Sequence, residues 1–185
     1  MERIQIIFLL AITLNITAFG QSQVKKSEKG TEESTEWKSL SGDKYEINHP
    51  SNWEVDKSGQ IGPSFFLFSP LTNDSDKFRE NVNLLIQDLN GYDLNLDQYV
   101  EISEGQIKTL VTNGKIISSK RQNNEKQEYH KMIYTGKQGI YDLKFEQYYW
   151  VIDKQAFVLT LTCVENEFNN YQSTGERILN SFKLK

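Results

Sequence analysis

A polar loop between two apolar runs holds the side chains of this sequence that are best suited to binding an ion. The surrounding sequence reads FFLFSPLTNDSDKFRENVNLLIQDL, from Phe65 to Leu89. The loop residues that could contact a ligand are Asn73, Asp74, Asp76, Arg79 and Glu80. Carboxylate and amide oxygens are the ligands that Ca²⁺ prefers, so Asp74, Asp76 and Glu80 are the calcium candidates.

The same loop also fits a simpler interpretation. An EF-hand loop carries glycine at its sixth position and glutamate at its twelfth, and this stretch does not reproduce that spacing. Asparagine and aspartate are common at strand-to-strand turns because their side chains hydrogen-bond to nearby backbone groups. We therefore favour an ordinary solvated loop, with Arg79 paired to a nearby carboxylate, and keep calcium binding as the alternative.

Other reactive side chains are few. The two histidines, His49 and His130, have no cysteine or histidine partner at ligand spacing, which argues against a zinc site. The single cysteine, Cys163, lies in FVLTLTCV, where the alternation of apolar residues predicts a strand and a buried thiol. There is no G-x-S-x-G, Walker or G-x-G-x-x-G motif. The sequence favours a protein without enzymatic activity, and a small hydrolase that uses residues 73–80 is the competing hypothesis.

Two aromatic side chains in QYYWVID are candidate binding residues. Strand alternation places Tyr149 on one face of a sheet and Tyr148 with Trp150 on the other. If a helix covers the second face, Tyr148 and Trp150 belong to the core, and otherwise they form an exposed contact patch. We expect them in the core, because this class of fold buries both faces of its sheet.

The N-terminal segment reads as a targeting signal rather than as part of the fold. Arg3 precedes an apolar run, and small residues occupy positions 18 and 20, which is the order found in a secretory signal peptide. We expect residues 1–20 to be removed, with a retained N-terminal anchor as the alternative. Residues 21–36 are polar and without periodicity, which predicts a disordered tether, and residues 37–185 form one domain.

Charge and cysteine content narrow the location and the partners. The net charge is −4 and there is no block of basic residues, which argues against nucleic acid and anionic membranes as partners. The mature chain lacks a transmembrane segment and a cysteine close to the signal peptide, so we do not expect a lipoprotein. The sequence predicts a secreted or periplasmic protein with a protein or envelope partner.

Two segments carry helical periodicity. In the first, residues 95–114, Asn95 can cap the helix, Gln98 completes a capping box and Gly114 is expected to end the helix in a left-handed conformation. The second occupies residues 166–185, with Asn166 as the expected cap.

The rest of the domain reads mainly as strands. Four β segments are expected between residues 114 and 165. The third has period-two alternation from Tyr141 to Val151, and Asp153-Lys154 predicts a tight hairpin between the last two. Two further strands flank the polar loop. The expected architecture is α+β, with a central antiparallel sheet of about six strands and two main helices.

A set of motifs in fixed order resembles the PsbP-like domain family. They are YEINHPSNWEV, then F-x-S-P followed by FRENVN, then QYYWVIDKQAFVLTLT, and finally NSFK near the C-terminus. The resemblance runs from Tyr45 to Lys185 and implies an α/β/α sandwich. This family includes the extrinsic subunit of photosystem II, a non-enzymatic protein that helps retain calcium and chloride, and many secreted bacterial relatives.

The resemblance and the residue pattern together lead to one functional hypothesis. We expect an exported, non-enzymatic PsbP-like domain without a cofactor that acts as a binding or accessory module for a protein or envelope partner. The alternative is a calcium-binding or small hydrolytic protein that uses the loop from Asn73 to Glu80.

Overall fold

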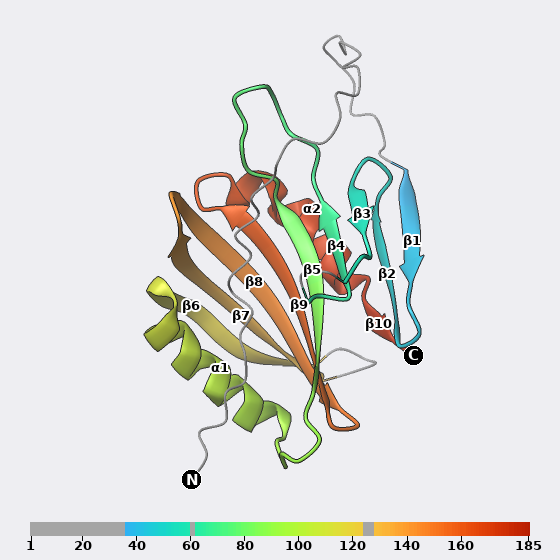
Figure 1. The fold of residues 1–185 in the computed structure, drawn as a ribbon, viewed down its shortest axis with the longest axis vertical. Coiled ribbons are helices and arrows are strands. Elements are labelled where there is room, and N and C mark those ends of the chain that lie inside the picture. The colour runs from blue at the N-terminus through green and yellow to red at the C-terminus, as the bar shows by residue number, and fades with distance from the viewer. Residues whose placement is uncertain (1–35, 60–61, 124–127) are drawn as a thin grey trace.

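The computed structural model describes residues 36–59, 62–123 and 128–185, whose elements are arranged as in Figure 1. The predicted signal peptide, and the predicted tether except for Glu36, lie outside the described residues. In chain order, the elements are β1 (Trp37–Ser41), β2 (Tyr45–Pro50), β3 (Glu54–Asp56), β4 (Phe65–Phe68), β5 (Asn81–Asp88), α1 (Leu96–Leu110), β6 (Thr112–Asn123), β7 (Glu128–Gln138), β8 (Tyr141–Ile152), β9 (Gln155–Val164), α2 (Phe168–Asn180) and β10 (Lys183–Leu184). Neither of these helices has the length and apolar character that crossing a membrane requires.

Seven strands form one antiparallel sheet in the order β3-β4-β5-β9-β8-β7-β6. The predicted α+β class, with two helices on a central antiparallel sheet, is confirmed, although the sheet has seven strands where we expected about six. A second sheet of three strands, in the order β1-β2-β10, is not predicted by the sequence. Its edge strand β10 has only two residues and comes from the C-terminal end of the chain, so no local sequence pattern predicts it.

Helix α1 begins with the predicted capping box. The Asn95 side chain accepts a hydrogen bond from the Gln98 backbone at 2.9 Å, and the Gln98 side chain accepts one from the Asn95 backbone at 2.9 Å. One side of the helix is buried against the large sheet, where Tyr99, Val100 and Ile107 pack among sheet residues. Those sheet residues include Met132, Tyr134, Phe145, Tyr149 and Val158.

The predicted end of this helix is wrong. α1 stops at Leu110, and the following Val111 is already extended, with φ −85° and ψ 122°. Gly114 lies inside β6 rather than at a left-handed helix end, and Asn113 takes the positive φ of 55° instead. The glycine is explained by close packing, because a Cβ at position 114 would lie 2.2 Å from the Ile107 carbonyl oxygen.

The opposite face of the large sheet is covered by α2 and the three-stranded sheet. From α2, Phe168, Ile178 and Leu179 are buried in the same cluster as Leu161 and Cys163 of β9. The predicted burial of Cys163 is thus confirmed, and this burial raises the pKa of its thiol. The predicted cap at Asn166 is wrong, because α2 begins after Glu167, whose side chain makes no capping hydrogen bond.

The predicted hairpin between β8 and β9 is confirmed. Ile152 pairs with Gln155, so that Asp153 and Lys154 alone form the connection. Both have positive φ, 49° and 57°, which is the backbone conformation that suits the twist of a two-residue hairpin. From this turn the two strands pair continuously, from Ile152–Gln155 to Leu143–Val164.

The two helices do not cover equal parts of the large sheet. α1 packs over β6, β7 and β8 on one face, whereas α2 packs over β9 and β5 on the other and also contacts β2 (Figure 1). The edge strand β6 departs from regular pairing with β7 at two places, between Thr112 and Lys115 and between Ile116 and Ser118. From Ser118 onward the pairing is regular, and this part of β6 borders the site described next.

Candidate functional site

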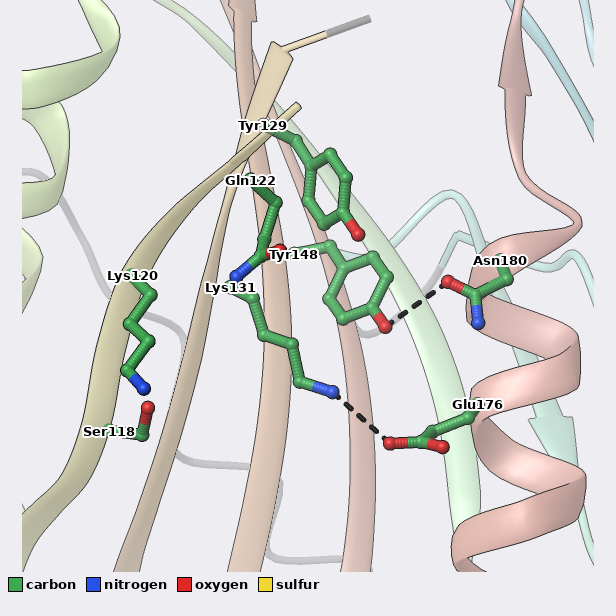
Figure 2. Close-up of a pocket in the computed structure, with 8 residues that line it drawn as sticks. All are labelled: Ser118, Lys120, Gln122, Tyr129, Lys131, Tyr148, Glu176 and Asn180. Atoms are coloured by element: carbon green, nitrogen blue, oxygen red, sulfur yellow. Dashed lines mark hydrogen bonds and ion pairs between the residues drawn. The ribbon is translucent and has the colours of Figure 1, made fainter. Parts of the chain in front are cut away.

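A groove lies between α2 and the outer strands of the large sheet, on the face opposite α1. Its volume is about 410 Å³. Figure 2 shows the eight lining residues, which are Ser118, Lys120, Gln122, Tyr129, Lys131, Tyr148, Glu176 and Asn180. They form a β6 wall, a floor from β7 and β8, and an α2 wall. We call this feature the α2 groove.

Strand register explains why these side chains meet. Lys120 of β6 pairs with Lys131 of β7, which in turn pairs with Tyr148 of β8. Gln122 pairs with Tyr129 in the same way. Residues directly opposite one another in antiparallel strands point to the same face of the sheet, so the three strands present one continuous surface here.

A buried carboxylate anchors the floor of the groove. Glu146 of β8 has 0% of its surface exposed. The Lys131 Nζ atom lies 2.7 Å from Glu146 Oε1, close enough for an ion pair although neither Glu146 oxygen accepts a well-aligned hydrogen bond. The same Nζ atom lies 3.1 Å from Oε1 of Glu176 on the helix wall. These three residues form an ion triad that connects β7, β8 and α2.

The triad keeps Lys131 charged. Burial alone would lower the pKa of Lys131, but its contacts with Glu146 and Glu176 outweigh burial and raise that pKa. A buried carboxylate is costly unless a partner compensates its charge, and Lys131 is that partner for Glu146. The two carboxylates and one ammonium leave the triad with one uncompensated negative charge, on the side of α2.

Aromatic rings make up the inner end of the floor. Tyr148 and Trp150 are 3% and 4% exposed, as the expected core position requires. The Tyr129 ring lies 4.8 Å from that of Tyr148 and 5.6 Å from that of Trp150, measured between centroids. The Tyr148 hydroxyl donates to Asn180 Oδ1 at 3.3 Å, so this ring joins the core to the groove. Burial and the charge of Glu146 raise the pKa of Tyr148.

The β6 wall contributes a cation that is free to meet a ligand. Lys120 is exposed, and within the described residues it forms no ion pair. Ser118 and Gln122 flank it on the same strand and add a hydroxyl and an amide (Figure 2). The groove therefore carries an unpaired positive charge on one wall and an excess negative charge on the other.

The predicted loop site is organised differently, because its polar groups bind to the loop itself. Asn73 Oδ1 accepts hydrogen bonds from the backbone of Ser75 at 2.9 Å and of Asp76 at 3.2 Å. The Asp76 carboxylate accepts from the Thr72 backbone at 3.0 Å and the Phe78 backbone at 3.1 Å. These bonds outweigh burial and lower the pKa of Asp76.

The remaining loop candidates point to separate environments. Arg79 forms the predicted ion pair, at 2.7 Å, and its partner is Glu54 of β3 rather than a loop carboxylate. Glu80 is buried, 3.4 Å from the Ser69 hydroxyl, and this burial raises its pKa. The Asp74 side chain is exposed. Whether this loop binds calcium stays a prediction.

Neither histidine belongs to a cluster of metal ligands. In the described ranges, no three histidine, cysteine, aspartate or glutamate residues are grouped so that they could hold a metal ion. His49 is buried with Nδ1 2.9 Å from the Pro50 carbonyl oxygen. His130 packs on the α1 side with Nε2 2.7 Å from the Ser119 hydroxyl, and burial lowers its pKa.

Comparisons with known proteins place the fold. No family model matches the sequence, and a search of curated proteins finds no significant match. Among solved structures, cyanobacterial PsbP (CyanoP) from Synechocystis aligns with a TM-score of 0.62 at 15% identity, covering 86% of this chain and 98% of that one. The chain therefore has a PsbP-like fold, as its motifs imply.

Two other structures share this fold. LpqN of Mycobacterium tuberculosis, described as involved in cell envelope biogenesis, aligns with a TM-score of 0.59 at 10% identity, over 82% of this chain and 92% of its own. PA94 of Pseudomonas aeruginosa, described as a putative regulator of unknown function, aligns with a TM-score of 0.57 at 11% identity, over 78% and 94%. At these identities the likeness concerns the fold alone.

Only part of the α2 groove is predicted by the sequence. Tyr148 is a candidate from the sequence, whereas Lys120, Lys131 and Glu176 are not among the predicted site residues. No local signal marked these residues, because a lysine on one face of a strand, such as Lys120 in β6 or Lys131 in β7, usually faces solvent. Pairing them required the strand register, which the sequence does not give.

Proposed function

We propose that this protein is an exported, non-enzymatic binding module, and that the α2 groove is the surface that contacts its ligand or partner. The observation that carries the proposal is the groove itself, an open concavity in which Lys120 has no ion partner among the described residues. Ligand sites typically have a volume of about 300 to 1,000 Å³ with a few convergent polar groups, and this groove has both properties.

The state of the reactive groups supports binding over catalysis. The Glu146 carboxylate is sealed from solvent and paired with Lys131, and the Cys163 thiol is buried with a raised pKa. A nucleophile or general base has to be reachable by the substrate. The groups that are reachable, Lys120 and Glu176, are suited to recognising charge.

Two observations that do not involve the groove support export and a location in the cell envelope. The N-terminal sequence has the order of a secretory signal peptide. One protein with the same fold is described as involved in cell envelope biogenesis, which fits a role for this chain beyond the cytosol. A shared fold does not by itself establish a shared role, so the envelope role is part of the proposal.

Site-specific photo-crosslinking in the cell that makes the protein tests this function. A photoreactive phenylalanine analogue replaces Gln122 at the rim of the groove, and in a matched control it replaces the exposed Asp74 in the loop. We expect one reproducible product from position 122, either a crosslinked protein or a small-molecule adduct detected by mass spectrometry, and none from position 74. Equal labelling at both positions, or none at position 122, would contradict the proposal.

A further inference from the structure

We infer that the α2 groove binds a small zwitterion, a molecule of the size of an amino acid or a dipeptide, with its carboxylate at Lys120 and its ammonium group at Glu176. This inference rests on the proposed function, because it names the ligand class of the same groove. It follows from the distribution of charge and hydrogen-bonding groups over the two walls.

The β6 wall is built to meet an anion. The Lys120 ammonium group is exposed and has no carboxylate partner in the described part of the chain. The Ser118 hydroxyl and the Gln122 amide lie on the same strand face and supply two further donors. A ligand carboxylate has two oxygens that can accept from these groups, and bonds to charged donors are the stronger kind.

The α2 wall is built to meet a cation. Oε1 of Glu176 receives Lys131 at 3.1 Å and the Gln172 amide at 3.4 Å, while Oε2 has no hydrogen bond or ion pair with any residue that the structure describes. Because Lys131 also compensates Glu146, it cannot neutralise both carboxylates. A ligand ammonium group at Glu176 Oε2 would compensate the remaining negative charge of the triad.

Opposite charges on the two walls favour a zwitterion over a simple ion. An inorganic anion would gain from Lys120 but would also face the net negative triad, and a simple cation would face Lys120. Repulsion of this kind is a common basis of specificity. A molecule that carries both charges gains at both walls.

The floor accommodates the apolar part of such a ligand. The partly exposed Tyr129 ring offers this surface at the inner end of the groove, where it lies 4.8 Å from the buried Tyr148 ring; the Asn180 amide also lines the groove. Methylene groups pack favourably on aromatic rings, and an amide can bond to a peptide group of the ligand. The groove volume of about 410 Å³ leaves room for a dipeptide.

Isothermal titration calorimetry with the purified protein tests the inference. The probes are free leucine, free glycyl-leucine, its N-acetylated form and its C-terminal amide, with sucrose and inorganic phosphate as ligands of other classes. We expect at least one free zwitterion to bind about tenfold more tightly than the same molecule with either charge blocked. Sucrose and phosphate are expected to give no saturable heat.

Two variants assign the charges to their walls. Lys120→Gln is expected to abolish the preference for the free carboxylate while keeping the preference for the free ammonium group. Glu176→Gln should do the reverse. Lys115→Gln, on the same strand but outside the groove, is the matched control and should bind as the parent does. Urea unfolding of all three variants establishes that they are folded.

Several results would overturn the inference. They are the absence of saturable heat with every zwitterion at millimolar concentration, equal affinity for free and blocked dipeptides, or sucrose or phosphate binding as tightly. If crosslinking at position 122 still captures a partner, the ligand class is wrong and the proposed function stands. If both experiments fail, the proposed function falls too.

Discussion

The loop from Asn73 to Glu80 and the α2 groove contain similar side chains but use them in opposite ways. In the loop, Asn73 and Asp76 accept hydrogen bonds from backbone groups two to four residues away. In the groove, Lys120 has no ion partner in the described ranges and Glu176 shares its only cation with Glu146. The polar side chains of the loop are satisfied by the backbone of the loop itself, whereas the groove contains charged groups that are not fully compensated.

The contrast teaches that composition alone is a poor guide to a binding site. A cluster of Asn, Asp and Glu is rich in oxygen ligands, yet a turn already needs those oxygens to satisfy its own backbone. The capacity to bind a ligand lies in groups that folding leaves unsatisfied. Each of the following predictions tests that contrast.

The largest effect is expected from removing the cation of the ion triad. Lys131→Met leaves the fully buried Glu146 without a partner, and breaking a buried pair in this way costs about 3 kcal/mol of the free energy of unfolding. Urea denaturation measures the loss. Lys120→Met is the matched control, since an exposed lysine without an ion pair should change stability by less than about 0.5 kcal/mol.

A second substitution separates lost charge pairing from lost packing. In the double variant Lys131→Met with Glu146→Gln, the buried charge is gone, so most of the lost stability should return. If Lys131→Met proves as mild as Lys120→Met, the triad is not an anchor and the groove floor is described wrongly.

In the loop, we expect the larger loss of stability when the substituted side chain accepts hydrogen bonds from the loop backbone. Asp76→Ala removes the acceptor for the backbone of Thr72 and Phe78, and we expect a loss of about 1 to 2 kcal/mol. Asp74→Ala, two residues away and exposed, should cost less than about 0.5 kcal/mol. Comparable losses for both variants would contradict the hydrogen-bond scheme.

The pH dependence of the Asp76 contribution follows from its lowered pKa. Because the folded-state pKa lies below the ordinary value of 3.8, the stabilisation is present above that value and is lost as pH falls through the folded pKa. The difference in stability between the parent and Asp76→Ala should therefore shrink in acid. Denaturation series at pH 7 and below pH 3 measure this difference.

Glu80, at the inner end of the loop, should behave in the opposite sense. Its raised pKa means that its contribution is present below the ordinary value of 4.5 and is lost as pH rises through the folded pKa. Glu80→Gln should therefore gain stability relative to the parent as pH rises to 7, by less than the loss expected for Asp76→Ala. Thermal unfolding of the parent and of Glu80→Gln across that pH range measures this gain, and the exposed Glu165→Gln is the control. A stability difference between parent and Glu80→Gln that does not change with pH would contradict the prediction.

The smallest effect is expected from calcium. The Asn73 oxygen and the Asp76 carboxylate already accept backbone hydrogen bonds, so a calcium ion would have to displace them. Titration of calcium into the protein should give no saturable heat. Saturable heat that disappears in the variant with Asp74→Ala and Asp76→Ala would restore the calcium hypothesis and weaken the contrast between loop and groove.

Local signals predicted most of the fold. The Asn95 capping box, the Asp153-Lys154 hairpin and the alternation around Cys163 each depend on residues within one element or one turn, and each is confirmed. Gly114 was misassigned because a glycine near a helix end usually marks a left-handed stop. Its true role depends on the closeness of the Ile107 carbonyl oxygen, which only the folded chain provides.

The groove could not be predicted for a similar reason. Its walls come from β6 and α2, which are separated along the chain by the three strands β7, β8 and β9, and their closeness depends on where α2 docks. Tyr148 and Trp150 lie in the core, as predicted, but no pattern in the sequence indicates that α2 packs over β9 and β5. The open strip over β6 and β7 is a product of that offset.

The irregular pairing of β6 has a consequence for the behaviour of the protein at high concentration. Exposed sheet edges are templates on which further chains can add and aggregate. Here one edge strand, β3, has three residues, and the other, β6, is interrupted twice and carries Lys115, Lys120 and Arg121. Neither edge of the large sheet offers a long, flat and uncharged row, so this sheet is protected against edge-to-edge assembly into fibrils.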